Sequence, residues 1–394
     1  MKRYMPGIDG LRAISVLAVM AYHFNLPWAQ GGLLGVGVFF VLSGYLITDQ
    51  ILLEWRLNKS LSLRNFWIRR FRRLLPAMGF MLLTVVLYLL FTDSSRLFSL
   101  KGDIVSSVFY MNNWYLIFHK VSYFESFGPA SPIGHLWSLS IEEQFYIIWP
   151  LALSIGLKWV PRRGKLLLYL LLLISASAAV MAIIYVPGTD PSRVYYGTDT
   201  RAFAILMGAA LAVVWPSWKL NRQISNAGQS VLDFTGGLGL ILLLVLIYRT
   251  NEYDDSLYPS GFLFLSVISA VVIAVLAHPA SRVGGIMGSR PLAWIGKHSY
   301  SLYIWHYPVI ILMNTNGANE KSGFAQILLQ LAVILMLSII SYRYIEEPFR
   351  RGTFRAQLLS LKSRISFKPM IGLILILILF VRLVTWITQK AGKG

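Results

Sequence analysis

The 394-residue chain contains no cysteine and few charged residues. Without cysteine it can form no disulfide, use no thiolate nucleophile, bind no metal through sulfur and carry no palmitoyl group. Charged residues make up 13% of the sequence and hydrophobic residues 56%, and the mean hydropathy is +0.61. This balance excludes an ordinary soluble domain and is typical of a chain that crosses a membrane many times.

Acidic residues are scarce as well, with 17 Asp and Glu against 36 Lys and Arg, which gives a net charge of +19. A nucleic-acid-binding protein would gather its basic side chains on one exposed face. Here they occupy short gaps between apolar stretches, so membrane topology explains the charge better. We expect no nucleic-acid partner.

The apolar stretches are long enough to span a bilayer. They lie at 8–26, 33–53, 74–92, 136–157, 166–186, 199–215, 230–248, 258–277, 298–313, 324–342 and 369–388. We predict an all-α, polytopic membrane protein with about 10–11 transmembrane helices around a central polar passage. With the N-terminus in the cytoplasm, 25 Lys and Arg residues fall in inside segments and 8 in outside segments, as the positive-inside rule requires.

Residues 1–351 are predicted to form one membrane domain, followed at 352–394 by a basic cytoplasmic linker, one more transmembrane helix and a short extracytoplasmic tail. The longest outside segment, 93–135, contains DIVSSVFYMNNWYLIF, which predicts an amphipathic stretch at the outer interface. The glycine-rich run GGLLGVGVFFVLSG at 31–44 predicts close helix packing.

The first predicted helix carries Asp9, Arg12 and His23 within an apolar run. At about 100° per residue, Arg12 and His23 share one face and lie about 16 Å apart along the axis. Asp9 can pair with Arg12 and lower the cost of burying it. The face resembles one wall of a polar passage, although His23 as a simple hydrogen-bonded helix contact stays open.

The sequence HLWSLSIEEQFYIIWP places Glu142 and Glu143 about two turns into a helix, at the predicted depth of His23. Ser138 and Tyr146 are each four residues from Glu142 and share its face. A carboxylate beside His23 would fix its tautomer and raise its basicity, as a general base requires. Alternatively, a buried glutamate only satisfies Arg201 or a tyrosine hydroxyl.

Two further stretches hold polar side chains. Asp199 and Arg201 are two residues apart, so each is expected to meet a different helix. Tyr300 and His306 precede Pro308, which frees a backbone carbonyl and suits a helix that borders a cavity. Packing and functional roles both remain open for these side chains. The predicted passage is lined by Asp9, Ser138, Tyr146, Asp199, Arg201, Tyr300 and His306.

The inside segment FWIRRFRRLLP at 66–76 contains Arg69, Arg70 and Arg73. Their guanidinium groups suit phosphates, although topogenic charge or contact with anionic lipid explains them equally well. The chain lacks a Walker A motif, G-x-G-x-x-G, H-E-x-x-H and any His/Asp metal spacing. We expect no metal and no permanently bound cofactor.

Seven motifs in one order carry a family resemblance: PGIDGLRAISVLAVMAYH, GVGVFFVLSGYLIT, RRFRRLLP, LWSLSIEEQFY, DTR, SYSLYIWHYP and YRYIEEPFRR. Together they resemble the membrane acyltransferase-3 family of bacterial O-acetyltransferases, over residues 4–351. The resemblance implies transfer of an acyl group, usually acetyl from cytoplasmic acetyl-CoA, to a hydroxyl of an extracytoplasmic glycan. Such acceptors are the O-antigen of lipopolysaccharide, peptidoglycan or an exopolysaccharide, and the implied location is the bacterial inner membrane.

The resemblance also assigns roles. It implies catalytic roles for His23, Glu142 and Glu143, and donor binding by Arg12, Arg69, Arg70 and Arg73. Some relatives continue into a periplasmic hydrolase-like domain with a catalytic serine, so a separate or missing periplasmic transferase domain is an expected partner.

Two other classes of function remain open. A transporter also has buried charges and a proline-broken helix, although we find no matching pair of interrupted helices in two halves of the chain. The second alternative class of function is a scaffold subunit of a glycan assembly complex. Binding of CoA would distinguish an enzyme from a transporter, which need not bind it. Loss of function in His23→Ala would distinguish an enzyme from a scaffold, which should tolerate the substitution.

Overall fold

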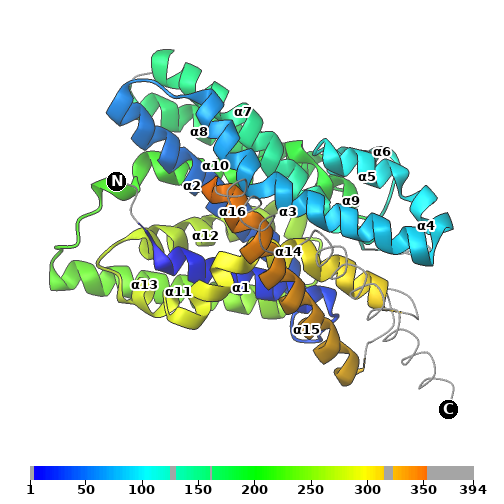
Figure 1. Ribbon diagram of the computed structural model, residues 1–394. Coiled ribbons are helices and arrows are strands. Elements are labelled where there is room, and N and C mark those ends of the chain that lie inside the picture. The colour runs from blue at the N-terminus through cyan, green and yellow to red at the C-terminus, as the bar shows by residue number, and fades with distance from the viewer. Residues whose placement is uncertain (1–3, 125–129, 160–161, 315–322, 353–394) are drawn as a thin grey trace, which may run out of the picture. The chain divides into compact units, whose positions relative to one another are not determined.

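The computed structural model describes residues 4–124, 130–159, 162–314 and 323–352. Within these ranges every regular element is a helix and there is no strand (Figure 1). Ten of the eleven predicted apolar stretches coincide with helices. The predicted helix at 369–388 and its flanking linker and tail lie outside the described residues.

Seven of the described helices are long and apolar enough to cross a membrane. Many of their exposed side chains are apolar, for example Leu168 at 56% and Ile183 at 79% exposure. Apolar side chains on the surface of long helices are what a bilayer requires, because lipid offers no partner for polar groups. The prediction of an all-α polytopic membrane protein is confirmed.

The chain forms two compact units, and the first comprises residues 1–63, 110–125 and 136–299. Its helices are α1 (Pro6–His23), α2 (Leu34–Asn58), α6 (Asn112–Phe118), α7 (Trp137–Trp159), α8 (Arg163–Ile184), α9 (Ser192–Tyr196), α10 (Thr198–Val214), α11 (Asn226–Arg249), α12 (Phe262–Ala277) and α13 (Arg282–Met287). Short 3-10 turns lie at Gln30–Leu33, Gly134–Leu136 and Ser217–Lys219, and a π-helical turn, η4, lies at Leu257–Gly261.

Glycines set the spacing of the inner helices of this unit. A methyl group added at Gly44 of α2 would overlap the carbonyl oxygen of Ile205 in α10, and one at Gly208 would overlap that of Val41. Gly32 and Gly35 approach the backbone of α1 in the same way. The predicted close packing of the 31–44 run is therefore confirmed, because backbones approach this closely only where side chains are absent.

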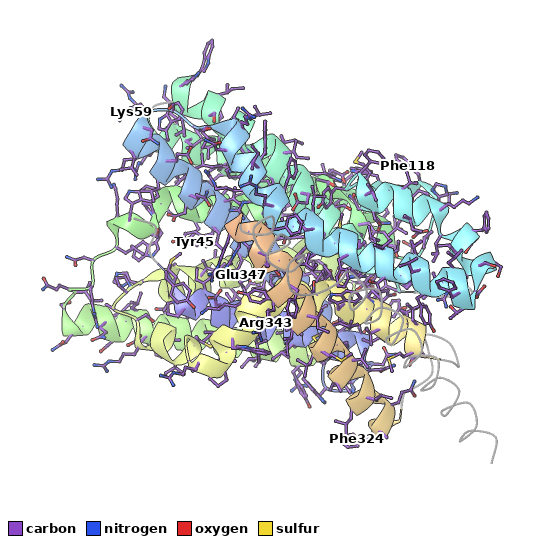
Figure 2. The ribbon with its side chains drawn as sticks, in the orientation of Figure 1. Tyr45, Lys59, Phe118, Phe324, Arg343 and Glu347 are labelled. Carbon is purple, nitrogen blue, oxygen red and sulfur yellow. The ribbon has the colours of Figure 1, made fainter. Side chains whose placement is uncertain are left out.

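Buried polar contacts fix one end of the α2–α10 pair. The Asp49 carboxylate accepts hydrogen bonds from the Ser217 amide at 2.8 Å and the Ser217 hydroxyl at 2.6 Å. The Tyr45 hydroxyl donates to the Trp215 carbonyl at 3.1 Å. Figure 2 labels Tyr45 among the side chains of the fold. In an apolar surrounding such groups are costly unless paired, so these contacts stabilise one register of the two helices.

The second unit comprises residues 64–109, 126–135 and 300–394. It contains nearly all of α3 (Leu63–Thr92), the later part of α14 (Arg290–Met313), and α4 (Ser94–Ser99), α5 (Lys101–Val108), α15 (Phe324–Ile340), the π-helical turn η5 (Ser341–Glu346) and α16 (Glu347–Arg351). In α5, Asp103 and Ser107 are buried, whereas Val105 is 57% exposed. Helix α5 is therefore amphipathic, and the location of the longer stretch at the outer interface stays a prediction.

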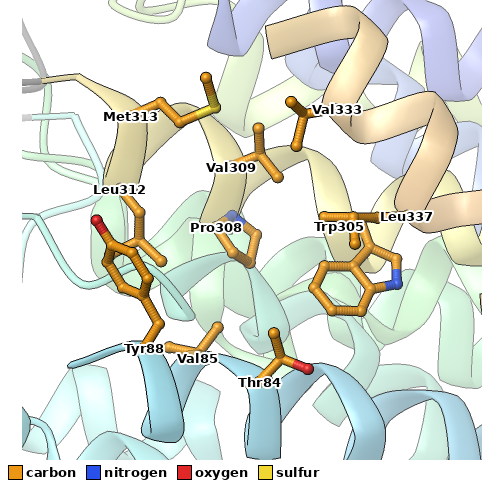
Figure 3. A pocket seen from close by; sticks show the side chains of 10 residues that line it. All are labelled: Thr84, Val85, Tyr88, Trp305, Pro308, Val309, Leu312, Met313, Val333 and Leu337. Atoms are coloured by element: carbon orange, nitrogen blue, oxygen red, sulfur yellow. The ribbon is translucent and has the colours of Figure 1, made fainter. Parts of the chain in front are cut away.

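Pro308 lies inside α14 and lines a small cavity of about 50 Å³ (Figure 3). The polar passage predicted beside this proline stays a prediction. The wall is built mainly of apolar side chains rather than polar ones. They come from α3, α14 and α15: Thr84, Val85, Tyr88, Trp305, Val309, Leu312, Met313, Val333 and Leu337.

Candidate active site

His23 is the last residue of α1. The helix stops there because Asn25 adopts a left-handed conformation, with φ of 53°, and the Leu26 amide bonds back to the Ala21 carbonyl. His23 is half-buried at this end of the helix.

The His23 ring is in contact with a hydroxyl from a distant part of the chain. Nε2 of His23 lies 3.1 Å from the Tyr123 hydroxyl. The direction of the bond follows the tautomer: neutral His23 with a free Nε2 accepts the phenolic proton. A hydroxyl within hydrogen-bond reach of a base is the arrangement used to activate a nucleophile.

Local structure explains how Tyr123 reaches this place. Helix α6 ends at Phe118, and Lys120 turns the chain in a left-handed conformation with φ of 52°. The Tyr123 amide then donates to the Ser192 hydroxyl at 2.8 Å. Ser192 in turn bonds to Asp190, so the backbone of Tyr123 is anchored to the loop before α9.

Aromatic rings surround Tyr123. Its ring centroid lies 4.8 Å from that of Tyr195, 5.9 Å from Tyr196 and 6.1 Å from Trp137. Tyr22 stacks on it with centroids 6.4 Å apart. These rings restrict the orientation of the Tyr123 side chain and lower the local polarity around its hydroxyl.

The start of α10 is tied to α6 and α7 by a polar network. Thr198 donates to Gln144 Oε1 at 2.6 Å, and Gln144 Nε2 donates to Asn113 Oδ1 at 3.0 Å. Asn113 Nδ2 donates to the Tyr196 carbonyl at 3.1 Å. The network therefore fixes α9 and its two tyrosines beside Tyr123.

The glutamates of α7 lie in the same unit. The Tyr146 hydroxyl is 3.1 Å from Glu142 Oε2 and 2.8 Å from Ser43 Oγ. Glu143 is buried, at 3% exposure, as is Ser138. Burial, followed by the negative charge of Glu143, raises the pKa of the loop residue Tyr110. The predicted contact of a glutamate carboxylate with His23 stays a prediction.

Asp9 and Arg12 form the predicted pair, with NH1 of Arg12 3.5 Å from Oδ1 of Asp9. Both side chains are largely buried, at 16% exposure for Arg12 and 13% for Asp9. The Tyr4 hydroxyl also donates to Asp9, at 2.9 Å. Since Arg12 and His23 are both on α1, their separation along the helix is about 16 Å at 1.5 Å per residue.

Asp199 and Arg201 do meet different partners. Asp199 receives two hydrogen bonds from Arg193, at 3.1 and 2.7 Å. Arg201 is fully buried and its guanidinium lies 3.7 Å from the centroid of the Phe262 ring. The spacing of two residues thus separated the two charges as predicted.

Of the four predicted donor-binding arginines, Arg12 lies on α1 in the first unit, and the other three lie on α3 in the second unit. Arg69 is exposed, and Arg70 is half-buried with its guanidinium 5.7 Å from the centroid of the Phe66 ring. The Nε atom of Arg73 is buried without a hydrogen-bond partner in the described chain. Tyr300 is close by in this unit, because its hydroxyl donates to the Leu74 carbonyl at 2.7 Å.

His306 is also in the second unit and is fully buried. Its Nδ1 lies 2.5 Å from the Tyr303 carbonyl oxygen, and its ring packs 5.5 Å from that of His135. The Tyr303 hydroxyl donates to the His135 carbonyl at 3.2 Å. These contacts stabilise the packing of α14 against the turn at Gly134–Leu136.

Several residues of this site were not predictable from the sequence. Tyr123, Tyr195 and the loop residue Glu252 were not among the predicted side chains. Burial raises the pKa of Glu252, and the interaction with Tyr22 opposes that rise. The one usable signal is the density of aromatic residues in VSYF at 121–124 and VYY at 194–196, within segments predicted to face outside.

Comparison with known proteins places the chain in a family. The model of an acyltransferase domain, acyltransferase 3, matches residues 5–343. Peptidoglycan O-acetyltransferase OatA of Listeria monocytogenes is 48% identical over 354 residues, which cover 90% of this chain and 57% of that protein. O-acetyltransferase OatA of Staphylococcus aureus is 38% identical over 377 residues, which cover 95% of this chain and 62% of that protein.

The chain therefore spans less than two thirds of the length of these relatives. No solved structure matches it. The family model extends over most of the sequence and includes α1, α2, α3, α7, α10 and α14, which carry six of the seven motifs quoted above. The chain belongs to the acyltransferase-3 family.

Proposed function

We propose that the chain is a membrane O-acyltransferase that moves an acetyl group from cytoplasmic acetyl-CoA to a hydroxyl of an extracytoplasmic glycan. The observation that carries the proposal is the contact between His23 Nε2 and the Tyr123 hydroxyl, 3.1 Å long. Family membership supports the reaction class. Peptidoglycan is the proposed acceptor because the relative from Listeria is described as a peptidoglycan O-acetyltransferase.

His23 acts as the general base in this proposal. In one route, the acceptor hydroxyl gives its proton to His23 and attacks the thioester carbonyl directly, the carbon–sulfur bond breaks, and the CoA thiolate leaves and takes the proton from His23. In the other, the Tyr123 hydroxyl gives its proton to Nε2 and forms an acetyl-tyrosine, the carbon–sulfur bond breaks, and the thiolate of CoA takes the proton from His23. The acceptor hydroxyl then displaces Tyr123, which regains a proton through His23.

Arg69, Arg70 and Arg73 are proposed to bind the phosphates of the donor, together with Arg12. Guanidinium groups suit this role because each offers a planar pair of donors to a phosphate. The distribution of Lys and Arg supports a cytoplasmic N-terminus, and in that orientation these arginines are on the side that holds acetyl-CoA. The membrane is then the bacterial inner membrane. Glu142 and Glu143 are proposed to orient and support His23.

The relatives are longer than this chain. We propose that a periplasmic transferase, as a further domain or a separate protein, accepts the acetyl group and completes transfer to the glycan. Under this scheme the membrane part described here loads the acyl group at the outer face.

The first experiment measures consumption of radiolabelled acetyl-CoA by the purified chain in detergent. His23→Ala should lose at least about 100-fold in rate, because general base catalysis contributes about 10²–10⁴. Tyr123→Phe removes one oxygen and keeps the ring, so it should abolish any acetyl-tyrosine trapped after acid quench. Arg69→Ala should weaken acetyl-CoA binding and leave the maximal rate within a few-fold, as loss of donor binding predicts.

Arg56→Ala is the matched control, because Arg56 is an exposed arginine at the end of α2 with no assigned role. It should behave as the unaltered chain in every assay. Binding of no acetyl-CoA by any form would contradict the enzyme and favour a transporter. Full activity in His23→Ala would favour a scaffold.

A further inference from the structure

Arg201 carries a positive charge that no group in the described chain neutralises. Its side chain is fully buried, and its Nε, NH1 and NH2 atoms have no hydrogen-bond partner among the described residues. Asp199, the nearest acid in the sequence, is paired with Arg193 instead. Native proteins leave very few buried polar groups unpaired, and each one calls for an explanation.

Aromatic rings enclose the guanidinium. Its central carbon lies 3.7 Å from the ring centroid of Phe262, 5.3 Å from that of Tyr195 and 5.6 Å from that of Phe40. These rings belong to α12, α9 and α2. Cation–π contacts are favourable by about 0.5–2 kcal/mol each. They compensate only part of the cost of removing a charge from water.

Packing alone does not account for this choice of residue. A leucine or methionine at position 201 would fill an aromatic enclosure without the desolvation penalty, and such replacements are often neutral or stabilising. The titratable groups that face Arg201 are Tyr195 on α9 and Tyr258 on η4. The residues of α2 and α12 that lie next to the guanidinium are Phe40, Gly37 and Phe262, none of which titrates. The charge is therefore left free to act on its surroundings.

The surroundings include the candidate active site. The Tyr195 ring, which Arg201 faces, lies 4.8 Å from the Tyr123 ring, and Tyr123 contacts His23. Burial raises the pKa of Tyr195, and the charge of Arg201 is the largest influence in the opposite direction. The field of the guanidinium thus reaches the phenol that packs against Tyr123.

We propose that Arg201 stabilises the negative charge that develops at the His23–Tyr123 pair during acyl transfer. It touches no reacting atom, so it is a positioning residue: it acts through Tyr195 and through its electric field. Charge develops when the attacking hydroxyl loses its proton and the thioester oxygen becomes an oxyanion. A fixed cation in a low-dielectric enclosure stabilises such charge far more than it would in water, without reorganising at the moment of reaction.

This inference rests on the proposed function. The test uses the 394-residue chain in detergent, with acetyl-CoA as donor and p-nitrophenyl acetate as a second donor that needs no CoA binding. Arg201→Met and Arg201→Gln remove the charge. Arg201→Lys keeps it. Phe262→Leu disturbs the same enclosure and leaves the guanidinium in place, so it serves as the packing control.

Arg201→Met and Arg201→Gln should lower kcat by about 100-fold with KM within about threefold, the size expected for a lost electrostatic stabiliser. In these two variants the increase of kcat/KM with pH should occur at higher pH than in the unaltered chain. The reason is that the attacking hydroxyl loses its proton less readily without the positive charge. Arg201→Lys should retain about a tenth of kcat or more at an unshifted pH profile. Phe262→Leu should lower the Tm and leave kcat and the pH profile nearly unchanged.

An unchanged kcat in folded Arg201→Met would overturn the proposal, and so would an equal loss in Phe262→Leu. If neither neutral variant folds, Arg201→Lys is the deciding variant, because it keeps the positive charge. A loss of kcat of about 100-fold in Arg201→Lys at a normal Tm would contradict a role for the charge. An unaltered chain that consumes neither donor would refute the proposed function itself. That outcome is distinct from an active chain that tolerates the loss of Arg201.

Discussion

Glu252 brings a carboxyl group close to the aromatic residues around His23. It is half-buried in the loop after α11, and its nearest described influence is the Tyr22 side chain, next to His23 in the sequence. Burial disfavours the charged carboxylate, which raises the pKa of Glu252 above 4.5, and Tyr22 opposes this rise. The folded chain therefore holds the Glu252 proton more tightly than the unfolded chain does.

The sign of the pH effect follows from linkage. A carboxyl group with a raised pKa in the folded state makes folding less favourable as pH rises through the window above 4.5. Glu252→Gln removes that titration and keeps the shape. We expect its Tm to exceed that of the unaltered chain at neutral pH and the difference to shrink as pH falls toward 4.5. An equal decrease of Tm at both pH values would show that the carboxylate makes a stabilising contact instead.

Helical periodicity explains which site residues the sequence could predict. Asp9, Arg12 and His23 lie on one helix, so their spacing alone predicted the Asp9–Arg12 pair that the structure contains. Tyr123 is 100 positions from His23, on a segment with no regular period. Its position depends on the left-handed Lys120 and on the Ser192 anchor. Neither the left-handed conformation of Lys120 nor the hydrogen bond to Ser192 produces a periodic pattern that could be recognised in a single sequence.

At the scale of helices, the crossing of α2 and α10 positions much of the site. Helix α10 carries Arg201, and α2 carries Phe40 and the Ser43 hydroxyl beside Tyr146. The two helices meet at Gly44 and Gly208, where each backbone lies against the other. A change in their spacing would displace the enclosure of Arg201 as a whole.

We predict that Gly44→Ala destabilises the chain by about 1–3 kcal/mol, the usual cost of overpacking a close helix contact. The added methyl group would collide with the Ile205 backbone, which has no flexible end to move away. Gly237→Ala in α11 is the matched control, since a methyl group there meets nothing within 4 Å. It should be neutral or stabilise by about 0.5–1 kcal/mol through helix propensity. Thermal unfolding in detergent measures both, and equal effects would contradict the packing argument.

Long helices were predictable because their apolar stretches are long, whereas the short elements were not. The stretch at 258–277 predicted one helix, but the structure begins it with the π-helical turn η4 at Leu257–Gly261 before α12. Helix α9 has only five residues and forms because Tyr195 and Tyr196 pack into the aromatic cluster. Tertiary contacts rather than local preference determine such elements, so periodicity does not detect them.

At the scale of the whole molecule, the distribution of charge is the main evidence for orientation. The positive-inside rule favours a cytoplasmic N-terminus because 25 Lys and Arg residues then face the cytoplasm against 8 outside. Helix α3 is a direct probe of this orientation. It has 30 residues and would extend about 45 Å at 1.5 Å per residue, enough to cross a bilayer.

The absence of cysteine makes the topology measurable with single substitutions. Ser60 and Ser94 are exposed and lie just before and just after α3. With the N-terminus inside, a membrane-impermeant maleimide applied to intact cells should label Ser94→Cys and leave Ser60→Cys unlabelled. Both should react once the membrane is permeabilised, which controls for accessibility. The reverse pattern would place Arg69, Arg70 and Arg73 on the face opposite to cytoplasmic acetyl-CoA, and donor binding by these arginines would then be untenable.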